Sequence, residues 1–473
     1  MINNLINMIV MDNKQKNLFD SLLPLKMQKL KKELKKIDEI LERKIEIMET
    51  VKKAFLKNNE NARYKGQKGY CLVTKFRCVL LKHMYGLSFM KTANRLESDL
   101  QWRLFTKTYF GKTPDVSRIK RWKKKISSEV LENIHKKILD YCREDKIIKG
   151  KKLRSDTTVT ETNIHYPTDS NLLSDGIRKI CSTMKQMKEH GINMGKSGRN
   201  FGRVVKKHVL NIIKFARAKG EKGKELKKKL YKSLMKISEQ VMKNVKYAKS
   251  ACTKKINATV DLMERINLES LKTEIDYWKT MLKKVLTQTQ ERILKGNKYY
   301  KEKIVSIFEP HSVGIKKGKA GKPIEFGRKI SITEVENKII SHYKVLVGNP
   351  NDGDTLLDVI DDHIEYFEKA PDSVAYDRGA WKTNMEEQLN EKGVKRVSIP
   401  AKGKKNEQRK QYEKQKWFKQ LQKFRAGSEG KISNLKRSHQ LGRCLYKGKE
   451  GMEQWIGLGV IACNLLSIAR QTT

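Results

Sequence analysis

Apolar side chains recur at alternating steps of three and four over residues 24–56, which is the spacing of one helix face. The positions are Met27, Leu30, Leu34, Ile37, Leu41, Met48, Val51 and Phe55. Lys44 occupies the one polar slot in the series. The pattern predicts a single long helix. Its heptads fit a coiled coil with a partner or an amphipathic helix packed on its own chain, and both remain open.

A compact helical region is predicted over residues 70–145. A periodic helix over 71–85 is followed by Gly86-Leu87-Ser88, a break with a Ser N-cap, and then by a helix from 89 to 96. This order is typical of a helix-turn-helix, although plain helical cores share it. A second cap signal at 113–117 precedes cations that would suit a helix in the major groove of DNA. They are Arg118, Lys120, Arg121, Lys123, Lys124 and Lys125.

The pattern changes to β-formers over residues 150–168, which predicts one strand or two short ones. Residues 175–300 are again helical and very basic, with two apolar stripes typical of a bundle core. After residue 303 strands and helices alternate. Strands are predicted at 304–308, 324–332, 338–347, 373–376 and 394–399, and helices at 355–368, 381–391 and over most of 407–443.

Strands that alternate with helices predict a mixed sheet with parallel pairs. The fold class expected is therefore an α/β domain interrupted by a helical insertion, with an all-α N-terminal region. The predicted domains are a helical segment at 1–57 and a helical DNA-binding domain at 58–148. The α/β domain would occupy 149–174 and 301–473, and the basic insertion 175–300.

Charge indicates the partner. The chain has 473 residues and a formal net charge of +50, from 103 Lys and Arg against 53 Asp and Glu. Such an excess strains a compact monomer unless a polyanion offsets it, so DNA or RNA is the expected partner. A Lys-rich surface that reflects biased codon usage is the alternative explanation.

Cysteine spacing and hydropathy limit the remaining classes. The seven cysteines include no Cys-x-x-Cys pair, which argues against a zinc ribbon or a thioredoxin-like motif and favours thiols in a reducing cytosol. The N-terminus lacks the features of a signal peptide. The apolar run 455–469 is too short for a membrane span and predicts a buried C-terminal helix.

Three acidic residues carry the candidate chemistry. Asp156 lies on the first predicted strand of the α/β domain, Asp377 follows a later strand, and Glu429 lies on the last long helix. Open α/β sheets place active sites beyond the carboxyl ends of their strands, so these carboxylates are expected to converge. Carboxylate oxygens suit Mg²⁺ or Mn²⁺, and two such ions can activate a nucleophile and stabilise a leaving 3′-oxygen.

Two cations share the helix face of Glu429. Arg425 precedes it by four positions and Lys436 follows it by seven, so all three lie on one side of a helix with about 3.6 residues per turn. Cations beside metal ligands can hold the scissile DNA strand.

These residues resemble those of a known family. Asp156, Asp377 and Glu429 look like the D-D-E triad of bacterial insertion-sequence transposases with an RNase H-like core. Arg425, Glu429 and Lys436 match the R-E-K portion of the family's Y-R-E-K signature, whereas Gln422 stands where Tyr is expected. Segments 162–169, 325–329 and 347–352 resemble the ISNCY-type or neighbouring groups.

The resemblance implies an Mg²⁺-dependent enzyme, with Mn²⁺ possible and two ions bound. It would bind double-stranded DNA at terminal inverted repeats, hydrolyse a phosphodiester at each transposon end and join the freed 3′-hydroxyl to target DNA. A homodimer or larger synaptic complex and a bacterial cytoplasmic, nucleoid-associated location are expected, with no membrane partner. A catalytically silent DNA-binding descendant and an RNase H-like nuclease or resolvase are the alternatives.

Overall fold

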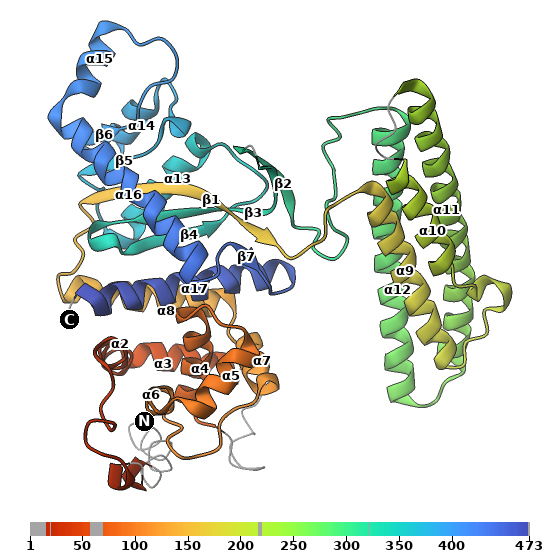
Figure 1. The fold of residues 1–473 in the computed structure, drawn as a ribbon, viewed down its shortest axis with the longest axis horizontal. Helices are drawn as coiled ribbons and strands as arrows, with labels where there is room; N and C mark the ends of the chain where they lie inside the picture. The colour runs from red at the N-terminus through yellow and green to blue at the C-terminus, as the bar shows by residue number, and fades with distance from the viewer. Residues whose placement is uncertain (1–15, 19, 57–69, 216–219, 320, 472–473) are drawn as a thin grey trace. The chain divides into compact units, whose positions relative to one another are not determined.

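The computed structural model describes residues 16–18, 20–56, 70–215, 220–319 and 321–471. The expected boundary between the first two domains falls at residues 57–58, outside the described part. The chain divides into two compact units (Figure 1). Unit 1 comprises Met1–Asn163 and Lys317–Thr473, and unit 2 comprises Ile164–Lys316.

A mixed sheet forms the centre of unit 1. Its main order is β2-β3-β1-β5-β6, with β4 paired to β3 and β7 paired to β1. β1 runs antiparallel to β3 and parallel to β5, which is parallel to β6. The predicted mixed sheet with parallel pairs is thus confirmed. The strands are β1 (Lys152–Thr162), β2 (Val313–Lys319), β3 (Lys322–Glu334), β4 (Ile340–Val345), β5 (Ser373–Ala375), β6 (Arg396–Ser398) and β7 (Arg443–Cys444).

Some predicted strands differ from the observed ones. Residues 304–308 form no strand, and Ile307 is instead buried in the helical core of unit 2. β2 was not predicted because its sequence, Val-Gly-Ile-Lys-Lys-Gly-Lys, is rich in Gly and Lys, which are poor strand formers. β7 is only two residues long and has no periodicity to detect.

Helices follow the later strands of unit 1. They are η5 (Arg378–Ala380), α13 (Asp352–Phe367), α14 (Met385–Glu391), α15 (Glu407–Lys414), α16 (Lys416–Ser438) and α17 (Gly448–Gln471). α14 is shorter than the predicted helix 381–391, because η5 and a turn precede it. Leu356 and Ile360 of α13 pack with Leu153, Val374 and Val397 of three strands.

The C-terminal helix α17 is a core element, as predicted. It is the one described helix that is long and apolar enough to cross a membrane by length and composition. However, 89% of its most apolar window is buried inside the protein. It packs against α8, α4 and α2, and a helix that is covered on all sides is expected to be apolar all round.

The N-terminal part of unit 1 is helical. It contains α2 (Lys32–Arg43), α3 (Ile45–Leu56), α4 (Leu72–Met84), α5 (Phe89–Ser98), α6 (Leu100–Phe105), α7 (Val116–Lys125) and α8 (Ser128–Glu144). The predicted break between α4 and α5 is confirmed. Gly86 has φ +58°, and a Cβ there would lie 2.7 Å from the carbonyl oxygen of Ser438. The Ser88 hydroxyl accepts a hydrogen bond from the Lys91 amide at 3.2 Å and caps α5.

The prediction of one continuous helix over 24–56 is wrong. The helix breaks at Lys44, whose φ of −94° and ψ of 77° end α2. The ammonium group of Lys44 is nearly buried and pairs with Glu144 of α8, which explains a polar residue in an apolar series. Ile37, Leu41 and Val51 are buried in the main core of the unit, so the apolar face packs on its own chain.

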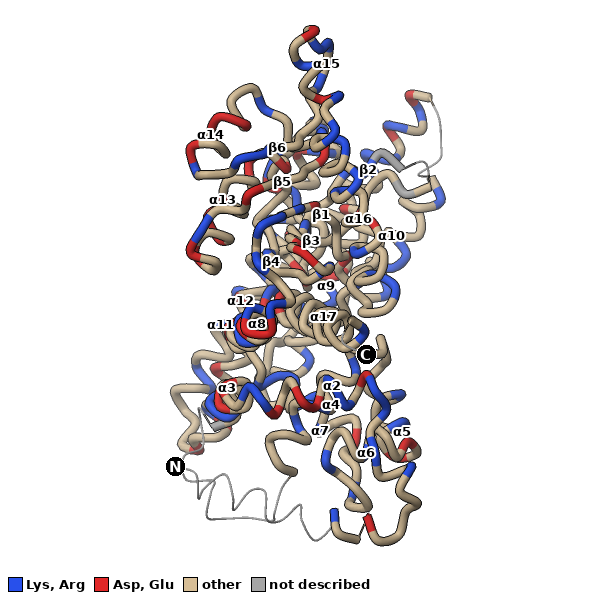
Figure 2. The backbone as a smooth tube through the Cα atoms, turned by 90° about the vertical axis from the view of Figure 1, so that its left-hand side faces the viewer, with Lys and Arg blue, Asp and Glu red and all other residues tan. Residues whose placement is uncertain are grey.

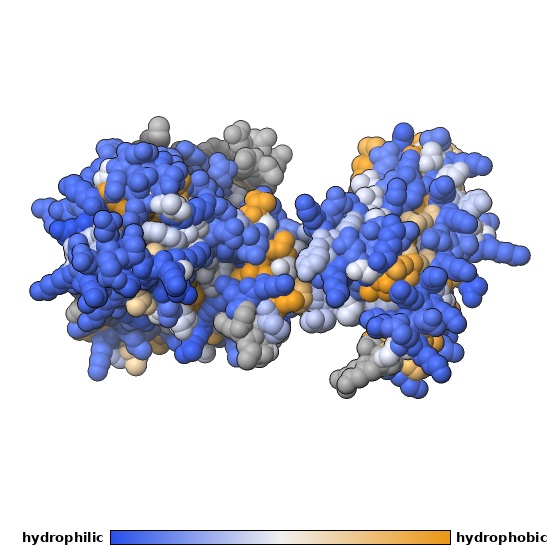
Figure 3. Space-filling view, turned by 90° about the horizontal axis from the view of Figure 1, so that it is seen from above, coloured by the Kyte–Doolittle hydropathy of each residue, from blue (hydrophilic) through white to orange (hydrophobic). Residues whose placement is uncertain are grey.

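Unit 2 is a helical bundle. Its elements are α9 (Asp169–Glu189), η2 (Gly195–Gly198), α10 (Gly202–Lys214), α11 (Gly220–Ala258), α12 (Leu262–Thr289) and the π-helical turn η3 (Gln290–Leu294). The predicted stripes on α11 and α12 form its core with α9 and α10. Figure 2 marks Lys and Arg along these helices, and Figure 3 shows hydrophilic side chains over most of the visible surface.

The cysteines agree with a reduced protein. All seven are free, and six of them are buried. Burial raises the pKa of the Cys78, Cys142 and Cys463 thiols, which keeps these groups protonated and unreactive.

We expect Arg154→Ala to lower the free energy of unfolding of unit 1 by about 3–5 kcal/mol, because it leaves Glu334 buried and unpaired. Arg154 and Glu334 are both buried and pair at 2.8 Å. Urea unfolding followed by tryptophan fluorescence measures the free energy of unfolding of unit 1, since five of the six tryptophans lie in this unit and only Trp278 lies in unit 2. The exposed pair Arg470–Glu33 has the same 2.8 Å length. Arg470→Ala should cost less than about 1 kcal/mol, and an equal loss in both variants would contradict the prediction.

Lys82 predicts a pH dependence of stability. It is buried among the rings of Phe89, Tyr446 and Trp455, and burial lowers its pKa from 10.5 to about 7. Between these values the unfolded chain holds a proton that the folded chain has lost, so stability should rise with pH from about 7 to 10.5. Lys82→Met should flatten this rise and increase stability at pH below 7. Denaturation curves across this range check both effects, and an unchanged slope in the variant would refute the assignment.

Candidate active site

Sheet register brings Asp156 and Asp377 together. β1 and β5 run parallel with Arg154 beside Ala375. Two residues further along each chain, Asp156 on β1 lies at the carboxyl end of β5, where Asp377 begins the turn into η5. The Gly379 amide donates to Asp377 Oδ1 at 2.7 Å and fixes this side chain. The predicted convergence at this edge of the sheet is therefore observed for these two residues.

Helix α16 carries Glu429 across the same strands. It contacts β1, β5 and β6. Arg154 of β1 donates to the carbonyl oxygen of Phe424 and, on its other side, to Glu334 of β3. A Cβ at Gly427 would overlap the Arg154 guanidinium, so glycine is required for the helix to approach the strand this closely.

The guanidinium of Arg425 lies among the three acids. Its Nη2 is 3.1 Å from Asp156 Oδ2 and 3.7 Å from Asp377 Oδ2, and its Nη1 is 3.1 Å from Glu429 Oε1. The Ser428 hydroxyl donates to Asp156 Oδ2 at 3.2 Å. One cationic group thus offsets part of the repulsion among the three carboxylates.

The acids differ in exposure. The Asp156 side chain is 16% exposed and that of Glu429 is 71% exposed. Burial raises the pKa of the Asp156 carboxyl, and nearby Asp377 adds to this, whereas Arg425 opposes it. Asp156 therefore forms the floor of the cluster and Glu429 its solvent-facing rim.

The donor chemistry of the cluster fits a divalent cation. Among the described residues, no group of three or more His, Cys, Asp or Glu side chains is spaced to hold an ion as it stands. However, oxygens of Asp156 and Asp377 approach the same Arg425 nitrogen, so both already face one cationic position. Carboxylate oxygens are the ligands that Mg²⁺ and Mn²⁺ prefer. These residues therefore suit a metal ion in place of the guanidinium.

Asp352 is a fourth carboxylate at this edge, and the sequence did not single it out as a site residue. Its Oδ1 accepts from the Thr157 hydroxyl at 2.8 Å and pairs with Lys329 at 2.8 Å. Its Oδ2 borders Gly379, where a Cβ would lie 3.1 Å away, on the same turn as Asp377. Asp352 is the first residue of α13, and its contact with Thr157 comes from a strand far away in the sequence, so only the tertiary structure reveals it.

Gln422 occupies the position where the family signature expects Tyr. Its amide nitrogen donates to the backbone oxygen of Ser398 at 2.7 Å and to that of Tyr376 at 3.2 Å. It therefore fastens α16 to the ends of β5 and β6, next to Asp377. Lys436 lies near the end of the continuous helix α16, on the face of Arg425 and Glu429 by helical periodicity.

The predicted DNA-contacting cations of α7 are not equivalent. Lys120 and Arg121 are exposed. Arg118 pairs with Asp115 at 2.8 Å. Lys123 lies over the Tyr446 ring, 3.7 Å from its centroid, and burial lowers its pKa to about 8. Lys123 is thus part of the packing, whereas Lys120 and Arg121 remain open to a ligand.

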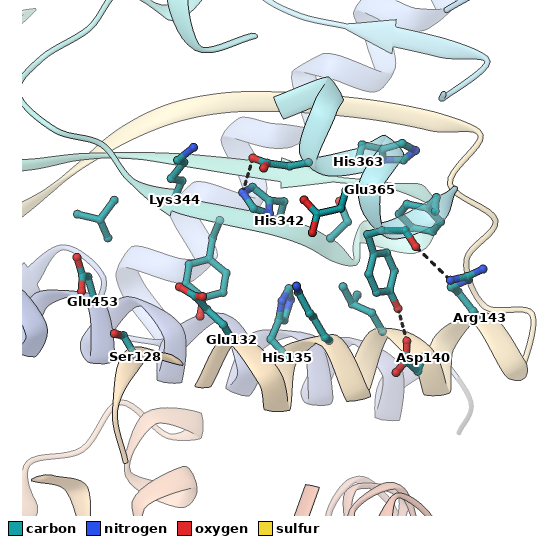
Figure 4. Close-up of a pocket in the computed structure, with 18 residues that line it drawn as sticks. Ser128, Glu132, His135, Asp140, Arg143, His342, Lys344, His363, Glu365 and Glu453 are labelled. Carbon is teal, nitrogen blue, oxygen red and sulfur yellow. Dashed lines mark hydrogen bonds and ion pairs between the residues drawn. The ribbon is translucent and has the colours of Figure 1, made fainter. Parts of the chain in front are cut away.

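A separate hollow of about 480 Å³ in unit 1 contains none of the three acids (Figure 4). It is lined by residues of α8, β4 and α13. His342 pairs with Asp362 at 2.9 Å, and Tyr366 donates to Asp140 at 2.8 Å. These two contacts join β4 to α13 and α13 to α8.

Comparison with known families agrees with the geometry. Residues 24–125 match the model of a transposase domain, DUF772, and residues 302–465 match that of the transposase DDE domain. No curated protein and no solved structure matches the chain. The second match contains Asp377 and Glu429 but begins after Asp156. Asp156 is therefore assigned to the site by the pairing of β1 with β5, which places it beside Asp377. With both domains present in this order, the chain belongs to the insertion-sequence DDE transposases.

Proposed function

We propose that this transposase hydrolyses phosphodiester bonds at terminal inverted repeats and joins the 3′-hydroxyl to target DNA at the Asp156, Asp377 and Glu429 cluster. The observation that carries the proposal is the gathering of these acids around one cationic position at the carboxyl end of β5. The mixed sheet supports an RNase H-like core. We further propose that the protein belongs to the ISNCY-type or a neighbouring subgroup, on the basis of segments 162–169, 325–329 and 347–352.

In this proposal Asp156 and Asp377 hold Mg²⁺ or Mn²⁺ from within the sheet, and Glu429 completes the site from α16. Two bound ions would supply activation of the attacking oxygen and stabilisation of the leaving 3′-oxygen. Burial of Asp156 and its bond from Ser428 keep one ligand in a fixed orientation. Glu429, at the exposed rim, lies where a DNA strand can approach.

Arg425 would change partners during the reaction. Without a metal its guanidinium balances the carboxylates. With the carboxylates engaged in holding metal ions, Arg425 would be free to bind the scissile phosphate, together with Lys436 on the same helix face. A guanidinium suits this step because its planar donors match phosphate oxygens as well as carboxylates.

DNA binding is assigned to the helical N-terminal region and to the excess of cations. The net charge of +50 supplies sequence-independent attraction to phosphates. Within α7, Lys120 and Arg121 would contact DNA directly, and Arg118 would do so once its pair with Asp115 opens. Lys123 would instead hold α7 in place by packing on the Tyr446 ring. A homodimer or larger synaptic complex in the bacterial cytoplasm, on double-stranded DNA, completes the proposal.

Each predicted domain has a role in the proposed reaction. Residues 58–148 would recognise transposon ends. Of the predicted catalytic domain at 149–174 and 301–473, the parts that lie in unit 1, 149–163 and 317–473, would form the catalytic domain, because 164–174 and 301–316 belong to unit 2. A silent DNA-binding descendant is the main alternative, and it is disfavoured because all three acids and their shared cation are in place.

The first test of this function removes each carboxylate charge. We expect Asp156→Asn, Asp377→Asn and Glu429→Gln each to reduce Mg²⁺-dependent strand cleavage by at least about 100-fold, since misplacement of about 1 Å alone costs that much. The assay uses DNA that carries the element's own ends, and gel shifts should show nearly unchanged binding. Asp361→Asn, an exposed acid paired with Lys392, is the matched control. Full cleavage by a triad variant would remove that residue from the site.

The second test concerns Arg425. We expect Arg425→Gln to lower the melting temperature of the metal-free protein, because three carboxylates lose their counter-ion. Added Mn²⁺ should then raise the melting temperature more in this variant than in the wild type, since binding of an ion to the folded state is no longer opposed by the guanidinium. Lys419→Gln, an exposed cation on the same helix, should respond as the wild type does. Equal Mn²⁺ shifts in all three proteins would contradict the exchange.

A further inference from the structure

Unit 2 contains a basic hollow that neither family match covers, since residues 126–301 lie between the two matches. The hollow has a volume of about 700 Å³, within the usual range of ligand sites. Its cations are Lys188 at the end of α9, and Lys196 and Arg199 in and after η2. Asn244 and Tyr247 of α11 form the opposite wall. No carboxylate lines it.

The cations of the hollow lack acidic partners. Lys188 donates to the carbonyl oxygen of Gly198 at 2.9 Å, and neither Lys196 nor Arg199 makes an ion pair within the described part of the chain. Some cations elsewhere in unit 2 are paired, for example Arg178 with Asp175 and Lys249 with Asp276, whereas no acid lines this hollow. The hollow therefore concentrates uncompensated positive charge, which attracts an anion.

Two further groups define the ligand. Asn244 is buried, and its Oδ1 accepts from Gln240 at 3.0 Å, while its Nδ2 makes no hydrogen bond with any described residue. That leaves a donor available on the wall of the hollow. Tyr247 is 65% exposed and lines the hollow beside the cations, so its ring is free to stack on a flat ligand. Cations, an amide donor and an open aromatic ring together match a phosphate with a neighbouring nucleobase.

We propose that this hollow binds a single-stranded segment of DNA, with a phosphate at Lys196 and Arg199 and an unpaired base against Tyr247. Duplex DNA presents phosphates but no free base face, so the exposed ring favours a single strand. The ligand class rests on the proposed transposase function, in which strands are separated at a cut end. The site itself is additional to the three acids and to α7.

The test measures binding of the full-length protein to a fluorescent single strand and to its duplex, at several salt concentrations and without divalent ions. The double variant Lys196→Gln with Arg199→Gln should lower the salt slope on the single strand by about 1.4, two lost contacts at about 0.7 each. Tyr247→Ala should weaken single-strand binding roughly 5- to 150-fold and duplex binding little.

Matched controls separate the hollow from general charge. Lys283→Gln with Lys284→Gln removes two exposed cations of α12, and Tyr299→Ala removes an exposed ring elsewhere in unit 2. Equal effects of the two cation pairs, or of the two tyrosines, would overturn the proposal, as would no effect at all. Because no metal is present, this result is independent of cleavage. If the Lys196/Arg199 variant kept the wild-type salt slope while the wild-type protein cleaved normally, only the proposed single-strand site would be rejected. If the variant lowered the slope as expected but triad variants still cleaved DNA, only the proposed catalytic chemistry would be rejected.

Discussion

The buried guanidinium of Arg154 is the contact on which the acid cluster depends. Arg154 belongs to β1 and joins this strand to two other elements. It pairs with Glu334 on β3 and donates a hydrogen bond to the Phe424 carbonyl oxygen on α16. Its position two residues before Asp156 means that the same strand segment carries both the anchor and the acid. Gly427 makes room for the guanidinium, and two residues later Glu429 points from the helix. The spacing of the anchor thus sets the spacing of the site.

Electrostatics at the site follow from this close approach. Helix α16 brings Arg425 within reach of acids from two strands, and the cluster is stable without metal because the protein supplies its own cation. A buried charge costs several kcal/mol unless it is paired, and Asp156, whose pKa burial raises, is the acid for which that pairing matters most. The same pairing opposes the entry of a metal ion, so Arg425 would lower the affinity for metal as well as orient the carboxylates.

Sequence periodicity predicted the elements well where one face is apolar and failed where a buried charge carries the structure. The α4–turn–α5 unit, the parallel strands and the buried C-terminal helix follow from spacing and capping residues. Lys44 looked like a polar slot within one helix, but its pair with Glu144 lies at a break. Asp352 and Gly427 lacked any local signal, because their roles come from contacts with residues far away in sequence.

The insertion is placed where the fold tolerates it best. β1 and β3 pair as adjacent antiparallel strands, from Arg154 with Glu334 to Glu161 with Gly327. The chain leaves the sheet after β1 and re-enters it through β2, the strand that pairs with β3 on its other side. Because loop-closure entropy grows slowly with length, a long connection between β1 and β2 costs little extra. Unit 2 has its own core and 35 Lys and Arg against 14 Asp and Glu between residues 164 and 316. Among the described strands only β2 begins in unit 2, so the excess charge of this unit is better explained by a ligand than by the folding of the sheet.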